Sequence, residues 1–170
     1  FLIFSVTFSI FIAFFTLFFA LNSTSYEVNT DDVFKVVIDA GHGGVDNGVV
    51  GKITGIKESE LNLKYALALS DKLNDLGIKT VLTRSTSAGL YGTATKNRKK
   101  KDMLKRKEII ENERPNLVIS LHMNYYVLEE RRGAQAFFDN KNESSKNIAQ
   151  IMQKNLNELE CNVKKYSAIK

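Results

Sequence analysis

Two short apolar runs, each rich in β-branched residues, end at a histidine, and this pattern constrains the fold more than any other feature of the chain. Residues 34–39 lead through Ala40 and Gly41 to His42, and residues 117–121 lead directly to His122. Short apolar runs bounded in this way are typical of buried strands. The chain has 2 histidines in all. We therefore predict that two strands deliver both imidazoles to the carboxyl end of one sheet.

Helical patterns separate the predicted strands. Strands are predicted at 34–39, 78–83, 117–121 and 134–139, and helices are predicted to begin at Glu58, at Asp102 and at Ser144 or Ser145. Alternation of strand and helix is typical of a mostly parallel sheet covered by helices. In such sheets, sites form beyond the carboxyl ends of the strands. We predict the α/β class, with a mixed, mostly parallel sheet flanked by helices in a single domain.

The first residues differ in composition from the rest of the chain. Residues 1–21 are apolar and carry no charge, and a helix needs about 20 such residues to cross the hydrocarbon core of a membrane. We predict a membrane anchor or signal segment at 1–21, a linker at 22–33 and the folded domain at 34–170. The domain is expected to act outside the cytoplasmic membrane. The single cysteine, Cys161, excludes an intrachain disulfide.

The net charge of +5 has a local origin in a run of lysines and arginines at 98–107. A solvated helix face is the interpretation that we favour, and attraction to a polyanion is the alternative. An anionic cell wall, lipid headgroups and nucleic acid are all polyanions. Because no aromatic residues are interleaved with the run, single-stranded nucleic acid is the least favoured partner, and we predict no nucleic-acid binding.

His42, Glu58 and His122 together form a plausible catalytic metal site. Two imidazoles and one carboxylate are a common set of zinc ligands, and they leave the fourth position to water. Zinc lowers the pKa of such a water to about 7 and polarises a carbonyl oxygen. Packed histidines are the alternative for either position taken alone. The glycine-rich loop at 41–55 could instead hold phosphate, but it lacks the Lys-Ser/Thr end of a P-loop.

Three polar residues flank the predicted ligands: Asp39, Asp46 and Asn124. They could fix the orientation of the ligands through hydrogen bonds. Asp and Asn are also common turn residues, and the two interpretations are about equally supported, so both stay open. Arg84 ends the second predicted strand, where it could meet an anionic substrate, although a surface position is the favoured interpretation.

Five segments occur in an order that resembles a known family. They are VIDAGHGGVDNG at 37–48, KESELNL at 57–63, Thr83-Arg84, ISLHMN at 119–124 and GAQAFF at 133–138. Together they resemble the zinc-dependent N-acetylmuramoyl-L-alanine amidases of the type 3 family, over about residues 35–155. A single anchored catalytic domain is also similar to the germination-specific amidases of spore-forming bacteria.

The resemblance implies a six-stranded, mostly parallel sheet and a peptidoglycan substrate. It implies hydrolysis of the amide between N-acetylmuramic acid and the L-alanine of the stem peptide, with His42, Glu58 and His122 as the zinc ligands. We also expect an accessory protein as a partner. We expect the N-terminal segment to engage the membrane, so that the domain lies in the cell wall or is anchored to the membrane.

The chain departs from the family pattern at three points. Ala40 replaces the usual proline, and the loop before Glu58 is about one residue longer, which leaves Glu60 as an alternative ligand. The family's general-base glutamate stands in a Glu-x-Gly-aromatic context, which is absent here. The catalytic residue is therefore unknown and is expected beyond Lys170. The alternative function is an inactive zinc-binding wall or regulatory protein on the same fold.

Overall fold

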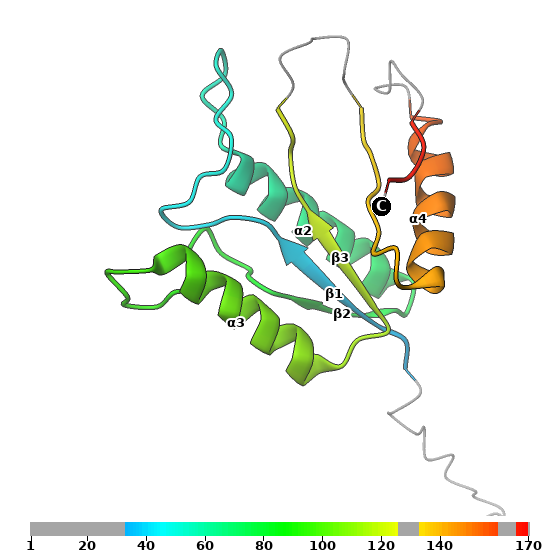
Figure 1. The fold of residues 1–170 in the computed structure, drawn as a ribbon, viewed down its shortest axis with the longest axis horizontal. Helices are drawn as coiled ribbons and strands as arrows, with labels where there is room; N and C mark the ends of the chain where they lie inside the picture. Colours follow the sequence, from blue (N-terminus) through cyan, green and yellow to red (C-terminus); the bar gives the residue numbers. More distant parts are fainter. Residues whose placement is uncertain (1–32, 126–132, 160–165, 170) are drawn as a thin grey trace, which may run out of the picture.

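The computed structural model describes residues 33–125, 133–159 and 166–169 (Figure 1). The predicted membrane segment at 1–21, nearly all of the predicted linker and Cys161 lie outside these residues. Within the described part of the chain, no helix is both long and apolar enough to cross a bilayer.

Three parallel strands form the sheet at the centre of the fold. They are β1 (Lys35–Ala40), β2 (Lys79–Leu82) and β3 (Leu117–Leu121), in the order β2-β1-β3. The central strand β1 pairs Val37 with Val81 on one side and with Val118 on the other. Because the strands are parallel, the residues that follow β1 and β3 emerge at the same edge of the sheet. The predicted α/β class is confirmed.

Two helices cover opposite faces of this sheet (Figure 1). Alternate residues of β1 point to opposite faces. Ile38 packs with Ala66 of α2 (Glu58–Asp75), whereas the neighbouring Asp39 bonds Arg106 of α3 (Arg98–Glu113). The buried core consists of Val36, Ile38, Ala40 and Ala66, packed against the partly buried Leu69, Leu73, Ile78, Leu82, Leu117, Ile119 and Leu121.

The helix starts were predicted with mixed success. Helix α2 begins at Glu58, as predicted. Helix α3 begins at Arg98, four residues before the predicted N-cap Asp102, whose buried carboxylate instead accepts from Leu90 N at 2.5 Å. Helix α4 (Glu143–Leu156) is capped by Asn142, which accepts from Ser145 N at 3.1 Å. Asp102 is thus a residue typical of caps whose side chain serves another contact, whereas at α4 the cap lies two or three residues before the predicted serines.

The predicted fourth strand at 134–139 does not join the sheet. Ala136 N donates to the side chain of Gln153 in α4 at 2.7 Å. Phe138 N donates to Ile169 O at 2.9 Å, and a bridge pairs Phe137 with Ile169 in parallel. Because these partners satisfy its backbone, the segment lies beside α4 (Figure 1). Within the described residues the sheet is thus parallel throughout, with three strands rather than the six that the resemblance implies.

Candidate metal centre

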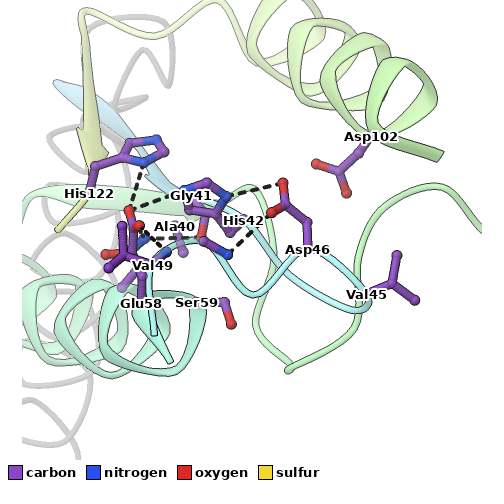
Figure 2. Close-up of polar contacts among 12 residues, drawn as sticks. Ala40, Gly41, His42, Val45, Asp46, Val49, Glu58, Ser59, Asp102 and His122 are labelled. Carbon is purple, nitrogen blue, oxygen red and sulfur yellow. Dashed lines mark hydrogen bonds and ion pairs between the residues drawn. The ribbon is translucent and has the colours of Figure 1, made fainter. Parts of the chain in front are cut away.

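The structure brings the three predicted ligands together at the carboxyl edge of the sheet (Figure 2). His42 follows β1, Glu58 opens α2 and His122 follows β3. One ligand atom from each lies within 4.8 Å of the other two. Glu58 Oε1 is 3.1 Å from both His42 Nε2 and His122 Nδ1. The alternative ligand Glu60 is exposed and lies 3.7 Å from Lys57 Nζ instead.

Glu58 is held as a buried carboxylate. Its side chain is 4% exposed. Oε2 accepts from Val49 N at 2.9 Å, and Oε1 accepts from Met123 N at 3.0 Å and from Asn62 Nδ2 at 3.4 Å. Burial raises the pKa of Glu58, but the hydrogen bonds from Val49, Met123 and Asn62 and the charge of His42 outweigh it and hold the pKa below its usual value. The group is therefore anionic at neutral pH, as a metal ligand must be.

Asp46 lies beside the ring of His42. Its Oδ2 lies 3.1 Å from His42 Nδ1, as the dashed contact in Figure 2 shows. Burial raises the pKa of Asp46, but its hydrogen bonds with His42 and Gly48 N outweigh burial, so the net pKa lies below the usual value. When the neutral ring donates from Nδ1 to Asp46, its Nε2 carries a lone pair directed at Glu58. Asp46 is thus placed where it can support His42 through a hydrogen bond.

This donor set fits a divalent cation. When Nδ1 of His42 carries the proton, Nε2 and the carboxylate oxygen of Glu58 are two acceptors 3.1 Å apart, and two acceptors at this separation repel unless a cation or proton lies between them. Two imidazoles and one carboxylate suit zinc. His122 is 47% exposed at its side chain, against 19% for His42. The site is therefore open to water and substrate on the His122 side.

Two glycines make room for the ligands. A Cβ added to Gly41 would lie 2.3 Å from Cε1 of His122. A Cβ added to Gly48 would lie 2.5 Å from Oε2 of Glu58 and 2.7 Å from Cδ2 of His42. Any side chain at either position would displace a predicted ligand, which explains why the sequence has glycine there.

Asp39 does not touch either histidine. Its Oδ1 accepts from Thr83 Oγ1 at 2.7 Å and pairs with Arg106, and its Oδ2 accepts from Ser120 Oγ at 2.8 Å. Because Thr83 follows β2 and Ser120 lies in β3, Asp39 joins the three strands just before the site. Asn124 is exposed, and among the described residues it makes no side-chain hydrogen bond to the predicted ligands.

Three polar residues at the site were missed by the sequence analysis or given a different role. Asn62 is fully buried one helical turn after Glu58 and donates to Gly41 O at 3.2 Å. Arg84 and Arg106 are 4% and 3% exposed. Arg84 was expected at the surface, and Arg106 belongs to the run that we expected to be solvated. The spacing of Asn62 from Glu58 was the one available signal.

Comparisons with known proteins agree with this geometry. The model of the Amidase_3 family, described as N-acetylmuramoyl-L-alanine amidase, matches residues 36–167. The germination-specific N-acetylmuramoyl-L-alanine amidase of Bacillus subtilis is 31% identical over 124 residues, which cover 71% of this chain and 52% of that protein. The chain thus spans about half the length of this curated relative.

Solved structures show the same fold. The CwlD amidase from Clostridioides difficile, solved in complex with the GerS lipoprotein, has a TM-score of 0.75 and 28% identity, covering 80% of this chain and 71% of that one. The catalytic domain of CwlV, an amidase from Bacillus (Paenibacillus) polymyxa var. colistinus, has a TM-score of 0.58 and 29% identity. The match covers 72% of this chain and 62% of that one. Motifs, fold and family model agree, and the chain belongs to the Amidase_3 family of N-acetylmuramoyl-L-alanine amidases.

Proposed function

We propose that this protein is a peptidoglycan hydrolase that uses zinc to cleave the amide between N-acetylmuramic acid and the L-alanine of the stem peptide. The observation that carries the proposal is the convergence of His42 Nε2 and His122 Nδ1 on Glu58 Oε1, each at 3.1 Å, in a chain of this family. In this proposal, His42, Glu58 and His122 hold the metal.

The residues around the site have separable tasks. A bound zinc ion would lower the pKa of its water to about 7 and polarise the scissile carbonyl. Asp46 fixes the tautomer and orientation of His42, and Asn62 fixes the carboxylate of Glu58. The exposed side of His122 leaves room for the substrate. We assign no proton acceptor, because Glu58 is the only glutamate in the cluster that the described residues form.

We further propose that the protein acts outside the cytoplasmic membrane. Peptidoglycan lies there, and the apolar, uncharged segment at 1–21 has the length of a membrane anchor or signal. We also propose an accessory protein as a partner. The structure of the CwlD amidase from Clostridioides difficile in complex with the GerS lipoprotein supports this proposal. The similarity to a germination-specific amidase makes spore peptidoglycan a substrate to test.

The test of the proposed function uses the full chain in mild detergent. Metal analysis should find about one zinc per chain, and His42→Ala should lose it. Incubation with purified vegetative or spore peptidoglycan should release new N-terminal alanine, and Lys105→Met, which alters an exposed residue of α3, should leave this unchanged. Absence of zinc in the wild type would contradict the metal site. Zinc without release of alanine, with or without an accessory lipoprotein, would favour the inactive wall protein.

A further inference from the structure

We infer that Arg84 and Arg106 position the loop that carries His42, so that the predicted ligands are arranged before a metal binds. We call these two side chains the arginine clamp. Both are almost fully buried, at 4% and 3% exposed. The inference deepens the proposed function and rests on its metal site, because it concerns how that site is held in place.

The arginine clamp binds three consecutive carbonyl oxygens. Arg84 Nε and Arg106 Nη1 each donate to Ala40 O at 2.8 Å. Arg84 Nη2 donates to Gly41 O at 2.9 Å, and Arg106 Nη2 donates to His42 O at 2.7 Å. A guanidinium presents its donors in a rigid planar fork, whereas an ammonium is a point charge on a flexible stem. Lysine at either position therefore cannot reproduce this set of bonds.

The bond to His42 O holds a disfavoured backbone conformation. His42 has a φ of 61°, in the left-handed region that residues with a Cβ rarely adopt. On the far side of the same peptide group, Gly43 N donates to Asp46 O at 2.9 Å. The peptide that follows His42 is thus fixed at its oxygen by Arg106 and at its nitrogen by Asp46. This fixes the direction in which the imidazole leaves the loop.

Arg84 also connects the loop to the segment that carries Glu58. Its Nη2 donates to Ser59 O at 2.8 Å as well as to Gly41 O. Ser59 follows Glu58 in the first turn of α2. One guanidinium nitrogen therefore joins the backbone beside one ligand to the backbone beside another.

Arg106 reaches the third ligand through Asp39. It pairs with Asp39 Oδ1, while Asp39 Oδ2 accepts from Ser120 Oγ, two residues before His122. Arg106 Nε also lies 2.6 Å from Asp102 Oδ2. The positive charges of the two buried arginines are therefore balanced by the carboxylates of Asp39 and Asp102, and the clamp adds no net charge next to the cation site.

Conservative variants test the clamp. We expect Arg84→Lys and Arg106→Lys each to weaken Zn²⁺ binding by about 10–100-fold, the range typical of residues that orient metal ligands. Affinity is measured by chelator competition at a temperature where unfolding curves show each metal-free variant to be folded. Co²⁺ absorption spectra of the same variants should shift, because the ligands are no longer held in one arrangement. A role in general stability alone would lower the unfolding temperature and leave both metal readouts unchanged.

Arg114→Lys is the matched control, because Arg114 is an exposed arginine at the C-cap of α3. It should bind Zn²⁺ like the wild type. If both clamp variants also bind Zn²⁺ like the wild type, the inference is overturned while the metal site stands. If the wild type itself binds no Zn²⁺, the proposed metal site fails first, so the two failures are distinguishable.

Hydrogen exchange on the unmodified chain covers the case in which the lysine variants do not fold. We expect the backbone amides of Gly41 and Gly43, which donate to Leu121 O and Asp46 O, to be protected to the same extent with and without Zn²⁺, because the clamp orders the loop by itself. Protection that develops only when Zn²⁺ is added would overturn the inference, since the metal and not the arginines would then order the loop.

Discussion

The ring of His122 lies directly against the α-carbon of Gly41, so close that a Cβ on Gly41 would be 2.3 Å from Cε1 of the imidazole. This contact joins the loop after β1 to the end of β3, and it sets where the second imidazole stands relative to Glu58. The same glycine accepts hydrogen bonds at its carbonyl from Asn62 and Arg84. Four polypeptide segments thus meet at one residue that cannot carry a side chain.

Gly41→Ala should displace His122 and weaken Zn²⁺ binding by about 10–100-fold, as expected when a ligand is misoriented. Chelator competition measures the dissociation constant. Gly55→Ala is the control, because a Cβ there meets nothing within 4 Å although its φ of +68° makes the substitution strained. That variant should lose stability and keep its Zn²⁺ affinity. Equal affinity in both variants would show that the contact with His122 does not matter.

Asn62→Ala should destabilise the protein and weaken the site together. Asn62 is fully buried and donates to Gly41 O and to Glu58 Oε1. Removing the donor leaves polar groups less well satisfied, at a cost of about 1–3 kcal/mol in the free energy of unfolding. Urea unfolding of the metal-free protein and Zn²⁺ titration measure the two effects. Asn74→Ala, later on the same helix, should leave Zn²⁺ affinity unchanged.

Asp46→Asn should lower Zn²⁺ affinity while leaving the fold intact. The amide still occupies the position beside His42 Nδ1, but the carboxylate that favours the Nδ1–H tautomer is gone. We expect a loss of about 10-fold or more in affinity, measured by chelator competition. Asp75→Asn removes an exposed carboxylate at the end of α2 and serves as the control. An unchanged dissociation constant in Asp46→Asn would contradict the orienting role.

Asp39 should make the stability of the metal-free protein depend on pH. Burial raises its pKa, but the charge of Arg106 and the hydrogen bonds from Thr83, Ser120 and Arg106 outweigh burial, so the net pKa is below the usual value. A depressed pKa in the folded state contributes stability above the unfolded pKa of about 4 and loses it as the pH falls through the folded pKa. Asp39→Asn should therefore be less stable than the wild type at pH 7.

The difference in unfolding free energy between wild type and Asp39→Asn should be about 1.5–3 kcal/mol at pH 7, the range for hydrogen bonds to charged groups. It should shrink progressively below pH 4. Urea unfolding at a series of pH values, with chelator present, measures it. Parallel pH profiles for the two proteins would show that Asp39 has the same pKa in the folded and unfolded states.

Local patterns predicted the parts of the site that depend on local structure. The apolar runs that end at His42 and His122 indicate strand ends, and Glu58 indicates a helix start. Because the strands pair in parallel, these three residues meet at one edge of the sheet. The strand predicted at 134–139 failed for the converse reason. Its pattern indicates an extended backbone, but the partners that satisfy this backbone are Gln153 of α4 and Ile169, not β3.

The sequence by itself determined the family, the alternation of strands and helices, and the residues that converge on the proposed metal. Only the tertiary structure decided which charged residues are buried. Arg106 lies in a run of exposed lysines, and nothing in its local sequence distinguishes it from them. It is buried because Asp39, 67 positions away in sequence, lies within hydrogen-bond distance, as do the carbonyl oxygens of Ala40 and His42. Burial of an arginine requires partners that satisfy its charge and its donors, and the folded chain supplies those partners from distant segments.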